Sequence, residues 1–439
     1  MAFIHPHSCE CTKSELDLFA VPPTQTSIEA SANIEYNPLS ALAHGLPIEF
    51  SVLGSGQDYI DLAGTQLYVA VKITKDDDTD IDATDEVGPV NLTLHSLFSE
   101  VDIKINDTLV SSTNNTYAYR AYLETLLSYG GDAKHSQLTA ALYYKDAATH
   151  LDDANPLPAA ANKGLKKRHS FFAGGRTVEM LGSIHSDLFF QDRLLPSDVG
   201  FRIRLVRNKD AFCLMSSAQN PGFKLKIVDC KLLVRKVKVS PSVYLAHAKA
   251  LEQSNAKYPV RRIICKTFTI PNGNLDFSQE SIFSGQLPTR IVVGFVDNDA
   301  FNGVYTKNPF NFKHYNLTNI KLYMDGQQQF LKPLTPDFAN NRFIAAYMSL
   351  FMATGKYQKD EGSDITRDDY AAGYALYCFD LSPDMAENDH FNLTKEGNVR
   401  LEGRFAAALP NTVNAVVYAE FENIIELDRN KNVIFDYTN

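Results

Sequence analysis

The sequence contains no tryptophan, although 27 phenylalanines and 21 tyrosines occur among its 439 residues. Carbohydrate-binding proteins rely on tryptophan to stack against sugars, so this absence argues against a sugar-binding protein. Cysteine is also scarce: the six cysteines are widely scattered, which excludes a disulfide scaffold and favours a reducing compartment. Stability must therefore come from an apolar core, and each half of the chain is long enough to bury one.

Long hydrophobic runs are missing as well. The longest uncharged stretch, 405–419, is interrupted by Pro410 and is shorter than the ~20 apolar residues that a membrane span needs. Residues 1–8 lack the apolar core of a signal peptide. The sequence therefore predicts neither a membrane span nor export.

The motifs of the common enzyme classes are also absent. There is no Gly-x-Ser-x-Gly elbow, no Gly-x-x-x-x-Gly-Lys phosphate loop, no Gly-x-Gly-x-x-Gly turn and no His-Glu-x-x-His zinc motif. The acids considered as a carboxylate pair stand near strand ends, and the histidines near strands are interpreted as core or interface residues: Glu179, Asp187 and Asp192, and His95, His185 and His314. We therefore expect no enzyme activity, no cofactor and no catalytic residue.

Four possible metal ligands crowd one short N-terminal segment, namely His5, His7, Cys9 and Cys11. Structural zinc sites usually take two well-separated pairs of ligands from two elements. The favoured interpretation is a mobile tail, and a metal clip between subunits is the alternative. No metal site is predicted.

The sequence does contain strand-like alternation. Residues 101–107 and 320–326 are apolar at every second position and end in a turn, which is typical of a half-buried strand. Each is followed by a helix-competent run closed by a glycine. Four matches occur in the same order at separations of 219 to 227 residues: Ile48 with Leu275, Leu67 with Ile291, Val101 with Ile320, and Tyr122 with Tyr347. One β unit used twice explains them, with chance similarity as the alternative.

Each half offers seven or eight short strands, a helix and long loops at matched places. Two antiparallel sheets packed face to face satisfy such a pattern. The predicted fold class is all-β, with two tandem antiparallel jelly rolls, short helices and long loop insertions, including a surface insertion at 132–176. The predicted organisation is an N-terminal arm (1–25), a first jelly roll (26–240), a linker helix (241–257), a second jelly roll (258–432) and a C-terminal tail (433–439).

Four stretches make the sequence familiar: 94–102 with its Leu-His-Ser-Leu-Phe start, 119–127 with Tyr-Arg-Ala-Tyr, 209–214, and 308–312 with Asn-Pro-Phe-Asn-Phe. They resemble the major capsid proteins of Polinton (Maverick) elements and adintoviruses. More distantly, they resemble the double jelly-roll capsid proteins of large eukaryotic DNA viruses and virophages. The resemblance covers about 14–426.

This resemblance implies a structural protein of the virion. Three subunits would form a pseudo-hexagonal capsomer, and capsomers would build an icosahedral shell around double-stranded DNA. The implied partners are two further copies of the chain, neighbouring capsomers, a penton-type minor capsid protein and packaged DNA. Assembly inside the host cell, in the nucleus or cytoplasm, is expected.

Two alternatives remain. A tandem jelly-roll carbohydrate-binding protein or hydrolase would share the fold class, and a host protein domesticated from such an element would share the whole fold. A two-domain cupin would need His-x-His inside a strand in each half, whereas the only His-x-His lies at His5 and His7.

Charge is unevenly distributed along a chain whose net charge is −10. Seven of the eleven residues at 76–86 are acidic, whereas 224–266 carries eleven Lys or Arg against two acids. In the family that the chain resembles, the end where each roll begins and finishes faces the genome, so non-specific phosphate contact is expected there. The candidate genome-facing residues are Lys236, Lys238, Arg261 and Arg262. The alternative is that they only form the solvated face of two edge strands.

Overall fold

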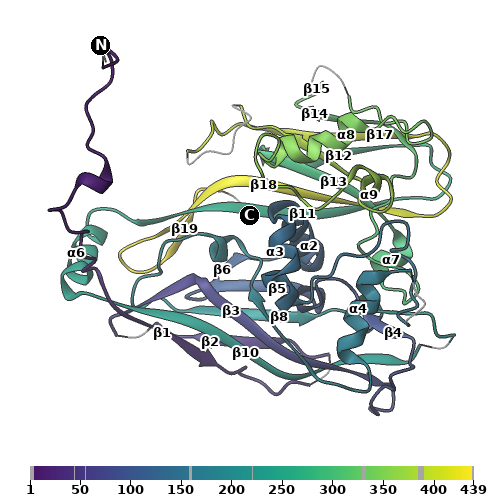
Figure 1. Ribbon diagram of the computed structural model, residues 1–439, viewed down its shortest axis with the longest axis horizontal. Coiled ribbons are helices and arrows are strands. Elements are labelled where there is room, and N and C mark those ends of the chain that lie inside the picture. The colour runs from purple at the N-terminus through teal and green to yellow at the C-terminus, as the bar shows by residue number, and fades with distance from the viewer. Residues whose placement is uncertain are drawn as a thin grey trace.

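The same arrangement of sheets occurs twice along the chain (Figure 1). The computed structural model describes residues 4–43, 45–54, 56–157, 161–219, 221–328, 333–383 and 390–437. In the first half, one sheet has the order β1-β10-β3-β7 and the other the order β2-β8-β5-β6. The strands are β1 (Ile28–Tyr36), β2 (Ile48–Val52), β3 (Asp58–Lys75), β5 (Phe98–Ile105), β6 (Thr108–Ser111), β7 (Val178–Ser183), β8 (Phe201–Arg207) and β10 (Phe223–Val239), with a separate pair β4 (Val87–Pro89) and β9 (Leu214–Ser216).

The second half repeats this order as β11-β18-β13-β16 and β12-β17-β14-β15. Its strands are β11 (Ala256–Ile270), β12 (Asp276–Gln286), β13 (Arg290–Asp297), β14 (Leu317–Met324), β15 (Gln327–Gln328), β16 (Leu376–Asp380), β17 (Glu396–Phe405) and β18 (Val413–Leu427). Counted within each half, both orders are first-eighth-third-sixth and second-seventh-fourth-fifth, with antiparallel neighbours throughout. This is the connectivity of a jelly roll, so the chain is a double jelly roll.

The repeat read from the sequence falls on equivalent elements. Ile48 begins the second strand β2 and Leu275 directly precedes the second strand β12, while Leu67 and Ile291 lie on the third strands β3 and β13. Val101 and Ile320 lie on the fourth strands, β5 and β14, while Tyr122 and Tyr347 lie on the helices that follow the fifth strands. The inward residues of each pair of strands are buried in the core: Leu67, Val69 and Val71, and Ile291, Val293 and Phe295.

Short helices fill the connections between the strands. They are α1 (Thr93–Ser96), α2 (Tyr117–Ser128), α3 (Gly131–His135), α4 (Lys163–Phe172), α5 (Asp210–Cys213), α6 (Pro241–Leu251), α7 (Asn298–Asn302), α8 (Ile344–Ala353) and α9 (Arg367–Ala371), with 3-10 turns at Ser14–Leu16, Gln137–Ala141 and η3 (Asp187–Phe190). Helix α6 joins the two rolls at one end of the long axis, and the N-terminal segment leaves the body at the same end (Figure 1). In the described part of the chain, no helix is long and apolar enough to cross a membrane.

Two sequence-based expectations need correction. Residues 132–176 do not form a purely surface insertion, because side chains such as Leu142, Leu165 and Arg168 are buried and α4 packs against β4. The predicted tail is not free either, since β19 (Val433–Phe435) pairs with the end of β18 from Ile425 to Leu427. Residues 433–435 therefore extend a sheet of the second roll.

Candidate functional site

The two predicted basic residues on β10 lie near the end that carries α6. Lys236 is buried, with 9% of its surface exposed, and its Nζ lies 5.8 Å from the centre of the Tyr36 ring. The Lys238 side chain is 52% exposed, and its Nζ lies 3.1 Å from Glu29 on the neighbouring strand. Of the two, only Lys238 presents its charge to solvent.

The other two predicted basic residues lie on β11 and differ in the same way. The Arg261 side chain is 57% exposed, with its Nε 3.9 Å from Glu420. The Arg262 guanidinium lies 4.6 Å from the Phe421 ring centre and 4.2 Å from that of Tyr437, and its Nε donates to Asn423. Burial lowers the pKa of Arg262. Arg262 is thus packed between aromatic rings.

The structure therefore does not leave the four predicted residues as one exposed cluster. The basic segment meets the acidic one at its beginning, where Lys224 Nζ lies 4.0 Å from Asp76, but its Lys238 part lies away from the acidic residues. In the β10–β3 register, Lys238 lies opposite Asp58, at the beginning of β3. The acidic segment 76–86 follows Lys75, at the other end of that 18-residue strand. The basic end of β10 and the acidic loop therefore lie at opposite ends of the first roll.

A buried group of charges joins the first roll to the second. Arg120 on α2 donates from Nη2 to Asp187 Oδ1 at 2.5 Å, and its Nε lies 3.5 Å from Glu124. The same Asp187 oxygen accepts the backbone N–H of Ile263, on β11 of the second roll, at 3.2 Å. Glu124 also lies 2.5 Å from the ring of His185. One guanidinium thus holds two carboxylates at the point where the rolls meet.

Burial and charge together set the protonation of this group. Burial would raise the pKa of Glu124, but Arg120 and His185 hold that pKa below its usual range. The pKa of Asp187 is raised, because burial outweighs the attraction of Arg120. Next to them, His95 is buried at 4.5 Å from the His185 ring, with its Nδ1 3.0 Å from the Tyr117 hydroxyl. Burial, reinforced by His185, keeps the pKa of His95 well below 6.5.

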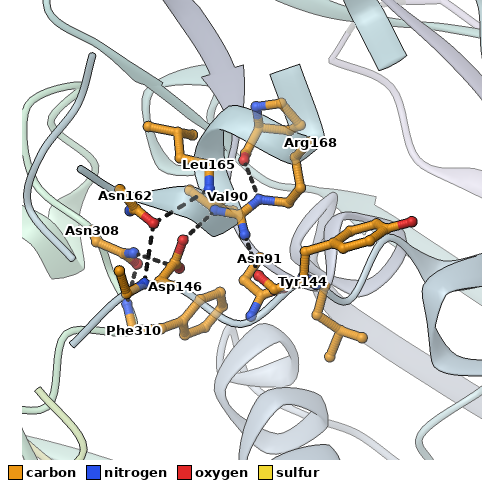
Figure 2. A network of polar contacts seen from close by, with 12 residues as sticks. Val90, Asn91, Tyr144, Asp146, Asn162, Leu165, Arg168, Asn308 and Phe310 are labelled. Atoms are coloured by element: carbon orange, nitrogen blue, oxygen red, sulfur yellow. Dashed lines mark hydrogen bonds and ion pairs between the residues drawn. The ribbon is translucent and has the colours of Figure 1, made fainter. Parts of the chain in front are cut away.

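A second buried network crosses between the rolls (Figure 2). Arg168 on α4 donates to Asp146 Oδ1 at 2.7 Å and to the carbonyl of Pro89 at 2.8 Å. The other Asp146 oxygen accepts from Asn308 of the second roll at 2.9 Å. The backbone carbonyl of Asp146 accepts from the Tyr374 hydroxyl, also of the second roll, at 2.8 Å. Both side chains of the Arg168–Asp146 pair are fully buried. Residues 132–176, which contain this pair, therefore connect the first roll to the second through buried hydrogen bonds.

Aromatic packing continues this join. The rings of Tyr122 on α2 and Phe310 of the second roll stack with centres 4.1 Å apart and planes within 3°. Tyr119 contacts the same Phe310 ring edge-on at 5.8 Å. The familiar stretches at 119–127 and 308–312 therefore meet in space, and part of their shared role is to fix one roll against the other.

Helices α2 and α8 occupy equivalent positions in the repeat, but they differ in how far they are buried by other elements. Eleven of the twelve residues of α2 are buried, and the helix packs against β11 and β18 of the second roll. In α8 only Ala346, Leu350 and Ala353 are buried, while Ile344 and Met352 are 42% and 55% exposed. Figure 1 shows α2 between the rolls and α8 on the outer side of the second roll. Strand β1, the equivalent of β11, is exposed along its length except at Tyr36.

Two of the three acids considered as a carboxylate pair have other partners. Asp187 binds Arg120, and Glu179 accepts from the Tyr68 hydroxyl at 2.8 Å. Among the described residues, no group of three or more His, Cys, Asp or Glu is placed to hold a metal ion, including those of the N-terminal segment.

No protein-family model matches the chain. Among curated proteins, an uncharacterized protein of Caenorhabditis elegans is 29% identical over 431 residues, which cover 95% of this chain and 99% of that protein.

Several solved structures from viruses are similar to this chain. A chain in the cryo-EM structure of the Sputnik virophage matches with a TM-score of 0.69 at 11% identity, over 99% of this chain and 94% of that one. The Faustovirus major capsid protein matches with a TM-score of 0.56 at 8% identity, over 93% of this chain and 92% of that one. The mavirus major capsid protein matches with a TM-score of 0.53 at 12% identity, over 100% and 96%. These likenesses extend over both rolls and show the shared fold.

Proposed function

We propose that the chain is a structural major capsid protein, which trimerises into pseudo-hexagonal capsomers of an icosahedral shell around double-stranded DNA. The observation that carries the proposal is the complete duplication of one jelly roll within a single chain. Two equivalent rolls in each of three copies give six similar units around one axis. The likeness in fold to two viral major capsid proteins supports this role.

The repeat also indicates how the copies pack. Within one chain, β11 and β18 of the second roll cover α2 of the first. The equivalents of these elements are β1 and β10 on one side and α8 on the other, and α8 has no such cover in the described chain. We infer that β1 and β10 of one copy cover α8 of the next. The exposed apolar residues Ile28 and Ile34 on β1 and Ile344 and Met352 on α8 suit such a contact.

This contact is heterologous, since two different surfaces meet, and a heterologous contact closes into a ring when its rotation permits. Alternating the contact within the chain with the contact between chains would give a ring of six rolls from three copies. The proposal extends to neighbouring capsomers, to a penton-type minor capsid protein at the vertices, and to a virion assembled inside the host cell.

The experiment is a measurement of mass and shape on the purified full-length protein. Light scattering after size exclusion should give about three times the monomer mass of 48.9 kDa, and negative-stain images should show hexagonal plates or closed shells. Met352→Glu should yield folded monomers, because it places a charge in the inferred contact. Leu53→Glu, which changes a 68% exposed leucine in a loop of the first roll, should leave the trimer intact.

A wild-type monomer whose melting temperature rises with a sugar would overturn the proposal in favour of the carbohydrate-binding or hydrolase alternative. A trimer that survives both Met352→Glu and Ile344→Glu would leave the capsid role standing but remove the inferred contact.

We further propose that Lys238 and Arg261 contact the packaged DNA, because they expose their charges, whereas Lys236 and Arg262 are held inside the protein. Phosphate contacts of this kind are non-specific and weaken with salt. Replacing Lys238 and Arg261 together by glutamine should lower the DNA content per particle, measured by the absorbance ratio of purified particles. Unchanged packaging would refute the contact.

A further inference from the structure

A cavity of about 330 Å³ lies beside the first jelly roll, where β10 runs beyond the end of β1. Strand β1 pairs with β10 only from Leu232 to Val239, so in the described chain no strand covers this edge of β10 at 223–231. The cavity is bounded by this part of β10, by the beginning of β2, by the end of β8 and by the loop that contains Leu42. Its volume is at the lower end of the range of small-molecule sites.

Two buried polar atoms in the wall of the cavity have no hydrogen-bond partner among the described residues: Thr74 Oγ1 and Arg207 Nε. Thr74 is fully buried, and the Arg207 side chain is 7% exposed. Arg207 is held in place by its other end, because Nη2 donates to the carbonyl of Leu225 and lies 3.8 Å from Asp210. Buried donors are nearly always satisfied, so both atoms call for an acceptor inside the cavity.

The remaining wall divides into a charged part and an apolar part. Lys224 and Lys226 join Arg207 as cations, against the single acid Asp78. The apolar part consists of Leu42, Ala43, Ile48 and Ile227. A bare inorganic anion would leave the apolar part unused, and a neutral apolar molecule would leave Arg207 Nε and the Thr74 hydroxyl unsatisfied.

We propose that this cavity binds a small amphipathic anion, consisting of a carboxylate head and one short aliphatic chain. The carboxylate accepts hydrogen bonds from Arg207 Nε and the Thr74 hydroxyl, with the charge of Lys226 nearby, and the chain lies along Ile48 and Ile227. The volume suits a single chain of about ten carbons rather than a two-chain lipid. This site is independent of the proposed capsid role, since it lies within one roll.

The test is isothermal titration calorimetry of the full-length protein with decanoate. Decanol, which has the same chain without the charge, and acetate, which has the head without the chain, should both bind at least about tenfold more weakly. Thr74→Val keeps the shape of the side chain and removes the hydroxyl, and it should weaken decanoate about tenfold while the protein stays folded.

Lys226→Met should also weaken decanoate, whereas Lys231→Met changes a lysine on the same strand outside the cavity and should not. The proposal is overturned if decanoate does not bind at millimolar concentration, or if decanol or acetate binds as tightly. Equal decanoate affinity in the wild type, Thr74→Val and Lys226→Met would also overturn it. The trimer measurement described above does not depend on any of these outcomes.

Discussion

The Asp187 carboxylate oxygen accepts from Arg120 at 2.5 Å and from the backbone of the second roll at 3.2 Å, so one ion pair ties the two halves of the chain. Replacing Arg120 by methionine would leave the buried Asp187 without a counter-charge and the buried Glu124 with only His185 beside it. We expect Arg120→Met to lower the free energy of unfolding by about 3–5 kcal/mol, measured by urea denaturation.

The control for this prediction is an exposed ion pair on the surface of the same roll. Arg204 lies 3.3 Å from Asp102 with 46% of its side chain exposed, so Arg204→Met should cost less than about 1 kcal/mol. Similar losses for the two variants would contradict the special role of Arg120.

His95 predicts a fall in stability below neutral pH. Its folded pKa lies well below the 6.5 of the unfolded chain, so the unfolded state binds the proton first as the pH falls. The stabilisation is complete above pH 6.5, and we expect it to decline as the pH falls below 6.5, by up to ~1.4 kcal/mol per pH unit. Tyr117 and His185, which face the ring, offer no carboxylate in direct contact to oppose this loss.

His95→Asn keeps a group that can bond to the Tyr117 hydroxyl but cannot titrate, and it should flatten the slope in urea titrations at several pH values. His150→Asn removes an exposed histidine and should leave the slope as it is. An unchanged slope in His95→Asn would assign the pH dependence to another group.

The packing of the Phe310 ring on Tyr122 leads us to expect that the two rolls unfold together. Because it is fully buried against Tyr122 across the join, Phe310→Ala should cost about 3–5 kcal/mol and separate the thermal transitions of the two rolls. Phe405→Ala creates a comparable cavity inside the second roll alone, where Phe405 packs on Phe277 and Phe295. It should separate the thermal transitions of the two rolls less than Phe310→Ala does. A single calorimetric transition in Phe310→Ala would refute the coupling.

Gly294 on β13 has no room for a side chain. A Cβ there would lie 2.5 Å from the Phe312 ring and 2.7 Å from Leu376, so Gly294→Ala should destabilise the protein by about 1–3 kcal/mol in urea denaturation. At Gly130 the nearest atom to an added Cβ lies 3.7 Å away, and Gly130→Ala should change stability by no more than about 0.5 kcal/mol. Equal effects would show that Phe312 moves aside easily.

Alternation along the strands was enough to predict the duplicated architecture. Leu67, Val69 and Val71 are buried at every second position because alternate side chains of a strand point to the same face, and this face packs against the other sheet. The separations between matching pieces then located equivalent strands, since a repeated topology places equivalent strands at a nearly constant interval.

The charged groups could not be placed in this way. Arg120 and Arg168 are both buried, although arginine is usually exposed to solvent. Arg120 pairs with Asp187, 67 positions away, and Arg168 pairs with Asp146, 22 positions away. For the same reason the sequence does not reveal that Arg262, one of the four candidate DNA contacts, lies between two aromatic rings. Pairings that close only in the folded chain leave no local pattern in the sequence.

The first roll is complete at Val239, before any strand of the second begins at Ala256. During synthesis, β10 can therefore pair with β1 and β3 before the similar strand β18 has been translated. Swapping of strands between two such similar halves is a hazard of repeat proteins, and sequential emergence limits it. If both halves became free to fold at the same time, as in refolding of the denatured full-length chain, this protection would be lost.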